Sequence, residues 1–338
     1  MTSVGTAART TALARIQVTL GALPGAEVLL KLEQTNPSGS IKDRTARGLL
    51  LDLENRGLLR AHSVVVESTS GNLGLALTNR LAERGCRFIA VIDPKTPAST
   101  RDAMSAAGVH LECVDEADGR GGFLLSRLRR VREIVAAQPG VLWPNQYRNP
   151  ANPRIHARTT GPEVLAQGGV DLGAVYVAVS TGGTLAGIAM HLRAVGHPAR
   201  IIAVDLATSA VTGAPTAAPR LIPGIGASRP SFFLRPWMYD GVARVTDVEA
   251  VALCRMLRED TGLLVGGSSG CVLAAVLRDL RRGRAAARST CVCPDGGDRY
   301  LDTIFDDAWL LATGIGDPVE AIMSRARDAG LTFTGVRQ

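Results

Sequence analysis

A lysine placed after a Gly- and Ser-rich stretch is the first residue of this chain to suggest covalent chemistry. Lys42 lies in the sequence NPSGSIKDR, where a flexible loop runs into a helix. Only Lys31, Lys42 and Lys95 interrupt an otherwise all-arginine basic complement, as a GC-rich coding sequence would also produce. Arginine cannot replace lysine in imine chemistry, because its guanidinium is not deprotonated at working pH. Lys42 is therefore the first candidate for a residue that reacts with a carbonyl group.

Three turns rich in Gly, Ser and Thr follow strand-like segments and open helices. Open α/β sheets bind ligands at such turns, outside the carboxyl ends of the strands. The turn at 180–184 offers bare amides, hydroxyls and a helix N-terminus, which suit a phosphate. The turn at 69–72 suits a carboxylate. Close packing and N-capping explain each turn equally well when it is taken alone. The turns are Thr69-Ser70-Gly71-Asn72, Ser180-Thr181-Gly182-Gly183-Thr184 and Gly266-Gly267-Ser268-Ser269-Gly270.

The elements that position these turns alternate between short apolar runs and helical stretches. This alternation predicts an α/β fold with mostly parallel sheets and helices on both faces, in two blocks that meet near 144–153. The expected strands are 64–67, 88–92, 110–114, 174–178, 201–205 and 290–293. The expected helices are 73–83, 101–107, 123–137, 185–194, 248–261 and 271–281.

Composition narrows the function. The chain has 338 residues, 46% hydrophobic but only 4% aromatic, and a net charge of +7. Its arginines are dispersed without interleaved aromatics, so we expect no nucleic-acid partner, and a basic balance suits small anionic substrates. No apolar run is long enough to span a membrane, and no metal site is expected. Without a CxxC pair, the six cysteines are interpreted as reduced core thiols of a cytoplasmic protein. They are Cys86, Cys113, Cys254, Cys271, Cys291 and Cys293.

Several motifs, taken in order, resemble one enzyme family. NPSGSIKDR, TSGNLG, NQYRNPANPRIHARTTGPEV, STGGT, GGSSG and PDGGDRYLDT are similar to the pyridoxal-phosphate enzymes of the cysteine synthase family, fold type II. The resemblance covers about residues 30 to 305. It implies pyridoxal 5′-phosphate, amino-acid substrates and a homodimer. It also implies a smaller mobile domain (36–146) that binds the substrate carboxylate, a larger cofactor domain (1–35 and 147–313) and a C-terminal tail (314–338).

The resemblance also assigns roles to the motif residues. Lys42 would form the internal aldimine and act as the general base, and Asn72 would bond the 3-hydroxyl of the cofactor. Ser268 would meet the pyridine nitrogen without protonating it, which favours prompt β-elimination and replacement. The phosphate would be held by Ser180, Thr181, Gly182, Gly183 and Thr184. The substrate carboxylate would be held by Thr69, Ser70, Gly71, Asn72 and Gln146.

The loop at 223–230, PGIGASRP, departs from ordinary cysteine synthases. Ser228 and Arg229 replace small and apolar residues, and Arg229, assisted by Arg220, would bind a phosphate leaving group or an acidic co-substrate. The competing interpretation of Arg229 is a surface arginine in an arginine-rich chain. RLIPGIGASRPS and SGNLG resemble the branch that makes N-(2-amino-2-carboxyethyl)-L-glutamate from O-phospho-L-serine and L-glutamate, for 2,3-diaminopropionate in siderophores or antibiotics.

Three other functions remain open. A cysteine synthase would use O-acetylserine or O-phosphoserine with sulfide, and a serine or threonine dehydratase would add no nucleophile at Cβ. A binding or regulatory module would keep the fold without turnover, although the intact Lys42 and Ser268 argue against it.

Overall fold

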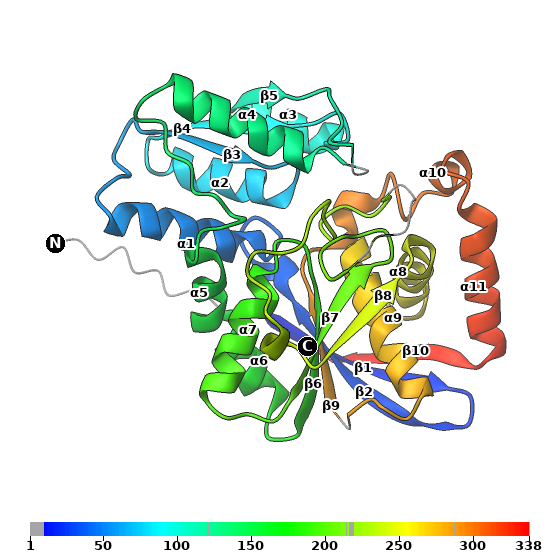
Figure 1. Cartoon of the computed structure of the whole chain (residues 1–338). Coiled ribbons are helices and arrows are strands. Elements are labelled where there is room, and N and C mark those ends of the chain that lie inside the picture. Colours follow the sequence, from blue (N-terminus) through cyan, green and yellow to red (C-terminus); the bar gives the residue numbers. More distant parts are fainter. Residues whose placement is uncertain (1–9, 120–121, 214, 216–219, 287, 338) are drawn as a thin grey trace.

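The chain folds into two α/β units, each built on its own sheet (Figure 1). The computed structural model describes residues 10–119, 122–213, 215, 220–286 and 288–337. The larger sheet has the strand order β10-β1-β2-β9-β6-β7-β8, and the smaller has the order β3-β4-β5. Every pair of neighbouring strands is parallel except the two that β1 makes with β2 and β10. The predicted α/β class with mostly parallel sheets is confirmed.

The elements follow one another along the chain in this way. The strands are β1 (Ala12–Leu20), β2 (Leu23–Leu32), β3 (Val64–Ser68), β4 (Arg87–Ile92), β5 (His110–Cys113), β6 (Leu172–Ala178), β7 (Arg200–Leu206), β8 (Gly241–Val245), β9 (Arg288–Cys293) and β10 (Leu331–Arg337). The α-helices are α1 (Lys42–Asn55), α2 (Asn72–Ala82), α3 (Ala98–Ala106), α4 (Leu124–Ala137), α5 (Ala151–Arg158), α6 (Thr160–Gly168), α7 (Gly183–Ala194), α8 (Asp247–Thr261), α9 (Gly267–Arg281), α10 (Asp307–Ala312) and α11 (Gly316–Asp328). Short 3-10 turns lie at Glu33–Thr35, Pro236–Met238 and Gly297–Tyr300.

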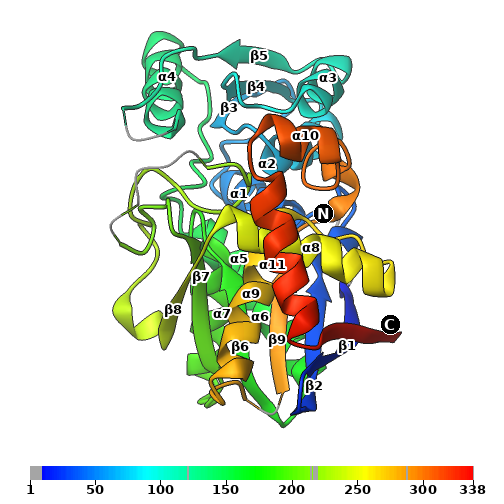
Figure 2. The same ribbon diagram turned by 90° about the vertical axis from the view of Figure 1, so that its right-hand side faces the viewer.

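The small sheet is buried on both faces. Alternate side chains of a strand point to opposite faces, so Val65 and Val66 enter different clusters. Val65 packs with apolar residues of α1, α2 and α3, whereas Val66 packs with Val131 and Ile134 of α4. Figures 1 and 2 show α4 on one side of this sheet and α2 and α3 on the other.

The large sheet is covered in the same way. Helices α8, α9 and α11 pack on one face, and α6 and α7 on the other. In Figure 2, α11 crosses the outside of the layer that α8 and α9 form. The C-terminal segment continues from α11 into β10, which pairs with β1 at the edge of the sheet. Because β10 occupies that edge, β1 is paired along both sides.

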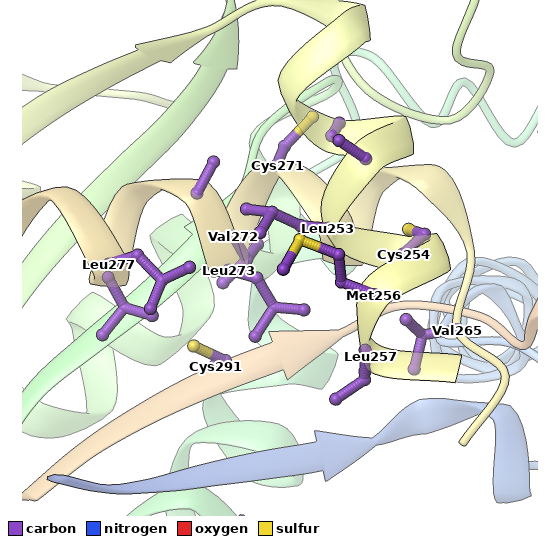
Figure 3. Close-up of a cluster of buried hydrophobic side chains, with 14 of the residues drawn as sticks. Leu253, Cys254, Met256, Leu257, Val265, Cys271, Val272, Leu273, Leu277 and Cys291 are labelled. Atoms are coloured by element: carbon purple, nitrogen blue, oxygen red, sulfur yellow. The ribbon is translucent and has the colours of Figure 1, made fainter. Parts of the chain in front are cut away.

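The interior between α8, α9 and β9 is closely packed (Figure 3). Leu257 of α8, Leu273 of α9 and Cys291 of β9 are all fully buried there. Truncating a leucine in such a place to alanine costs about 2–5 kcal/mol, because the neighbours cannot fill the space. This packing fixes the N-terminus of α9, where Ser268 lies, against the sheet.

The cysteines are all free, and four of the six are buried in this large unit. Burial raises the pKa of the Cys271 and Cys291 thiols well above the usual value. The interpretation as core thiols is wrong for Cys113, which is exposed on the short strand β5, and only partly right for Cys86. Cys113 is the last residue of β5, the edge strand of the small sheet, so a neighbouring strand flanks it on one side only.

Helix α5 joins the two units, lying between α1 and α7. Glycines allow its close approach on both sides: a Cβ on Gly48 of α1 would stand 2.7 Å from Ile155 Cβ, and one on Gly187 of α7 would stand 2.4 Å from His156 Cβ. The buried His156 ring contacts Thr45 Oγ1 of α1 at 3.1 Å. Burial, with nearby positive charge, holds the pKa of this histidine well below its usual value.

Within the described part of the chain, no helix is long and apolar enough to cross a membrane. The same residues contain no group of three or more His, Cys, Asp or Glu side chains arranged to hold a metal ion.

Candidate active site

Lys42 is the first residue of α1, and the loop before it is pinned to the large unit. The Ile41 amide donates to the Pro294 carbonyl (2.8 Å), and the Lys42 amide donates to the Ser40 hydroxyl (3.3 Å). Burial lowers the pKa of the Lys42 amine, and the negative charge of Asp295 opposes this shift. A lowered pKa increases the fraction of neutral amine, which is the form that attacks a carbonyl or accepts a proton.

The turn Ser180–Thr184 connects the end of β6 to the start of α7. Gly182 is the N-cap residue, with a left-handed φ of 87° that favours glycine, and the Gly183 amide donates to the Thr181 hydroxyl (3.3 Å). The Ser180 hydroxyl donates to the Gly226 carbonyl (3.0 Å), which ties the turn to the loop that follows β7. Backbone amides at a helix N-terminus, with two hydroxyls beside them, suit an anion.

The first residue of α7, Gly183, packs directly against Asn152. A Cβ on Gly183 would stand 2.1 Å from Asn152 Oδ1. The buried Asn152 amide donates to the Gln146 carbonyl (2.7 Å) and to the Thr181 hydroxyl (3.3 Å). Asn152 therefore links the turn Ser180–Thr184 to Gln146.

The turn Thr69–Asn72 lies between β3 and α2, with Asn72 as the first helical residue. The Asn72 amide donates to Asp295 Oδ2 (2.7 Å), and its carbonyl oxygen accepts from the Arg299 guanidinium. Both ends of the Asn72 side chain are thus held by the loop that follows β9. The Gln146 side chain reaches the same turn from the other side, because its amide donates to the Ser68 carbonyl (2.9 Å).

Ser268 is buried in the first turn of α9. The neighbouring Gly266 amide donates to the Asp295 carbonyl (3.1 Å), so this helix start adjoins the loop that holds Asn72. Asp295 Oδ1 is buried there without a hydrogen-bond partner. An unpaired buried carboxylate oxygen beside Ser268 marks a place where a polar group can be held.

The loop 223–230, called the entrance loop, places Arg229 beside the turn Ser180–Thr184, called the phosphate turn. Arg229, Tyr147, Ser180 and Thr181 line one small pocket, and the Arg229 guanidinium carbon stands 5.3 Å from the centre of the Tyr147 ring. Arg229 thus lies between the Tyr147 ring and the turn Ser180–Thr184. Burial lowers the pKa of its guanidinium, but a guanidinium keeps its charge at neutral pH.

Ser228 is bonded to Arg220 and not to the turn Ser180–Thr184. Its hydroxyl accepts a hydrogen bond from the Arg220 guanidinium (3.1 Å). A Cβ on Gly122 would stand 2.7 Å from both Arg220 Nη2 and Ser228 Oγ. Gly122 belongs to the segment before α4, so the small unit touches the entrance loop of the large one at this point.

Three residues that join parts of the site were not predicted from the sequence. Asp295, Arg299 and Tyr300 hold Asn72; the Tyr300 hydroxyl donates to Asp295 Oδ2 at 2.5 Å. Burial raises the pKa of the Asp295 carboxyl, and hydrogen bonds from Tyr300 and Asn72 oppose the shift. The motif PDGGDRY contains all three residues, and an aspartate in a Gly-rich turn directly after an apolar run was the available signal.

The fold and these turns define a class of enzyme. A family model described as pyridoxal-phosphate dependent enzyme matches residues 6–295, and the chain belongs to that family. Its cofactor is pyridoxal 5′-phosphate. The residues present fit this group: a buried amine of lowered pKa, the N-terminus of α7 for a phosphate, and the unpaired buried Asp295 Oδ1 beside Ser268.

Two relatives are similar over most of their length. N-(2-amino-2-carboxyethyl)-L-glutamate synthase of Ralstonia nicotianae is 41% identical over 84% of this chain and 84% of the relative. The protein of the same name from Cupriavidus metallidurans is 40% identical over 92% of each chain. Among solved structures, an O-ureido-L-serine synthase superposes with a TM-score of 0.78 at 30% identity, covering 89% of this chain and 96% of that one. A hydrogen sulfide-producing enzyme (Fn1055) superposes with a TM-score of 0.79 at 25% identity, covering 87% of this chain and 88% of that one.

Proposed function

We propose that this enzyme joins O-phospho-L-serine to the amino group of L-glutamate, releasing phosphate and forming N-(2-amino-2-carboxyethyl)-L-glutamate. The observation that carries the proposal is the name shared by the two relatives at 40% and 41% identity. The reaction is a β-replacement, the class of chemistry that the family and the Lys42 site support. Its product would serve as a precursor of 2,3-diaminopropionate for a siderophore or an antibiotic.

The chain's own residues supply the binding and the proton transfer. Bound pyridoxal 5′-phosphate contributes a carbonyl that can link to amines and a ring that accepts electrons from Cα. The Lys42 amine, neutral more often because burial lowers its pKa, is the base for the Cα proton. Thr69, Ser70, Asn72 and Gln146 offer hydroxyl and amide groups to the α-carboxylate. Closure of the two units over these groups would exclude water.

Two arginines in or near the entrance loop, Arg229 and Arg220, could bind the leaving group of the donor. Arg229 lines the pocket that Ser180 and Thr181 also line, and Arg220 bonds Ser228 nearby. Charge-assisted hydrogen bonds from guanidinium groups favour a phosphate dianion over a neutral acetyl ester. Because Ser180 and Thr181 are assigned to the cofactor phosphate, we propose that Arg229 of this loop and the nearby Arg220 meet the phosphate of O-phospho-L-serine.

The direct test is to add O-phospho-L-serine to the holoenzyme and then L-glutamate, while recording cofactor absorbance and free phosphate. We expect the donor to change the spectrum and glutamate to restore it with continuous phosphate release. Restoration by sulfide but not glutamate would make the protein a cysteine synthase. No spectral change with O-phospho-L-serine, nor with O-acetyl-L-serine in its place, would support a binding module instead.

We also propose that two copies associate through an exposed apolar groove. Pro153, Met190, Phe232 and Trp237 line it, and Phe232 and Trp237 are 47% and 58% exposed. Exposed aromatic side chains beside a groove are typical of protein interfaces. Light scattering should give the mass of a dimer, and Trp237→Glu should give a monomer.

Two further assignments stay proposals. A mobile domain of residues 36–146 is supported by the separate core of the small sheet, and the remaining residues 1–35 and 147–313, with the C-terminal tail 314–338, surround the large sheet. A reducing, cytoplasmic location is supported by six free thiols. Domain mobility can be tested by small-angle scattering with and without O-phospho-L-serine.

A further inference from the structure

Glu67, at the end of β3, is a fully buried carboxylate that no step described so far uses. Its Oε1 accepts from the Ser68 amide (2.9 Å) and from Trp143 Nε1 (3.2 Å). Its Oε2 accepts from the Gln146 amide (3.1 Å), and the Asn145 amide also donates to the carboxylate. All four of these donors are neutral N–H groups, and three of them belong to the segment 143–146.

The segment that Glu67 holds contains a tight turn. Asn145 has a left-handed φ of 56°, a conformation that asparagine adopts more readily than most residues other than glycine. The amides of Asn145 and of the next residue, Gln146, both donate to the Glu67 carboxylate, so Glu67 stabilises this turn.

The turn determines where Gln146 lies. Its side-chain amide donates to the Ser68 carbonyl, directly before the turn Thr69–Asn72. Its own carbonyl accepts from Asn152, which also reaches the phosphate turn at Thr181. A displacement of Gln146 would therefore change the contacts of both the turn Thr69–Asn72 and the turn Ser180–Thr184.

We infer that Glu67 is a positioning residue, whose carboxylate holds the segment 143–146 so that Gln146 meets the α-carboxylate of the donor amino acid. This inference rests on the proposed substrate-binding role of Gln146. Glu67 itself does not touch the substrate; it acts through the peptide groups that it holds.

The protonation state of Glu67 decides whether it can do this. A carboxylate accepts from all four donors, whereas a protonated carboxyl presents a hydroxyl to a group of donors. Burial raises the pKa of Glu67 to about 7, and the hydrogen bonds from Gln146, Trp143, Ser68 and Asn145 oppose the shift. The titratable group that interacts with Glu67 is Tyr147, on the same segment. The charges of Arg127, Arg229 and Asp93 act on Tyr147 in turn, and Arg127 and Asp93 form an ion pair (3.2 Å).

The first test is the variant Glu67→Gln in the holoenzyme. The carboxamide keeps the size but places N–H groups against N–H donors. We expect KM for O-phospho-L-serine to rise roughly 10-fold or more, with kcat changed by less than about 3-fold. The matched control is Glu259→Gln on α8, a half-exposed carboxylate paired with Arg327, which should leave both constants unchanged. An unchanged KM in Glu67→Gln, or equal losses in the two variants, would overturn the inference.

Trp143 provides a second readout that does not depend on turnover. The chain has three tryptophans, so holoenzyme labelled with ¹⁵N-tryptophan gives three indole signals, and Trp143→Phe identifies the relevant one. We expect this signal to move in Glu67→Gln, because the indole N–H then loses the carboxylate as its acceptor. If the signal keeps its wild-type position in Glu67→Gln, the carboxylate does not hold this segment and the inference is overturned; if Glu67→Gln does not fold, Glu67→Asp is compared in the same way.

These measurements are separable from the proposed function. Binding of the donor precedes the entry of glutamate, so KM can be followed by the cofactor spectrum with either glutamate or sulfide as second substrate. If O-phospho-L-serine does not react, the proposed function fails, and the same variants are compared with O-acetyl-L-serine, which carries the same α-carboxylate. A normal affinity of Glu67→Gln for that donor would then overturn the role of Glu67.

Discussion

The contact between Gly183 and Asn152 gives the sharpest prediction about how the site is built. In Gly183→Ala, the new Cβ would lie 2.1 Å from Asn152 Oδ1 and 2.7 Å from Asn152 Nδ2. Because Asn152 is buried and held by α5, it has to leave its hydrogen bonds to Gln146 and Thr181. The substitution therefore acts on the link between the phosphate turn and the carboxylate side of the site.

The magnitude follows from these contacts. Each lost hydrogen bond costs about 1 kcal/mol, and forcing a methyl group into a packed site costs about 1–3 kcal/mol. We expect Gly183→Ala to lower the free energy of unfolding by about 3–5 kcal/mol and to weaken retention of pyridoxal 5′-phosphate, because Thr181 loses its neighbour.

The assay is urea unfolding followed by circular dichroism, with cofactor retention measured by dialysis. Gly316→Ala is the matched control, since Gly316 is the first residue of α11 and its nearest neighbour to a new Cβ is 3.8 Å away. That change should alter stability by less than about 1 kcal/mol, in the stabilising direction. If the two variants agree within about 0.5 kcal/mol, the steric argument is refuted.

Three other predictions are simpler. Lys42→Ala should abolish the visible absorbance of the lysine–cofactor link, whereas the exposed Lys95→Ala should keep it; a Lys42→Ala protein that retains the band would exclude Lys42 as the linking residue. Arg229→Ala should raise KM for O-phospho-L-serine by roughly 10-fold or more and affect O-acetyl-L-serine far less; equal losses would show that Arg229 does not bind phosphate. Thr246→Ala removes the capping box of α8 and should cost about 1 kcal/mol in urea unfolding, with no change in KM.

The sequence predicted the parts of the fold that follow local rules. The expected strand at 64–67 corresponds to β3, and the expected helix at 185–194 ends with α7, because apolar runs and Gly-rich turns mark them directly. Helix α9 begins at Gly267, four residues before the expected start, since Gly and Ser are weak helix formers. Helices α5 and α6 were missed in a segment rich in proline.

The edge of the large sheet was also missed. Strand β1 alternates buried and exposed side chains, the pattern of a strand with one covered face, and it pairs antiparallel with β2 and β10. Strands of parallel sheets are recognised by continuous apolar runs, whereas β1 alternates apolar and polar residues. The expectation of parallel sheets therefore led to β1 being missed.

Within the site, the turns were found but their connections were not. Asn72 and Arg299 lie 227 positions apart in the chain, and Glu67 and Gln146 lie 79 apart. No spacing rule relates residues so distant, and a buried glutamate in a strand gives no local sign of its partners. The sequence thus predicts which turns would contact ligands, whereas the residues that hold those turns in place required the structure.

The strand order of the large sheet has a consequence for how the protein is made. The small sheet uses only β3, β4 and β5, which follow one another closely, so it can form while the ribosome is still adding residues. Strand β9 lies between β2 and β6, so the two halves of the large sheet stay unjoined until residues 288–293 have left the exit tunnel. Until then β2 and β6 each expose an unpaired edge, the kind of surface that aggregates. We therefore expect chains truncated before β9 to depend on chaperones and to be unable to retain the cofactor.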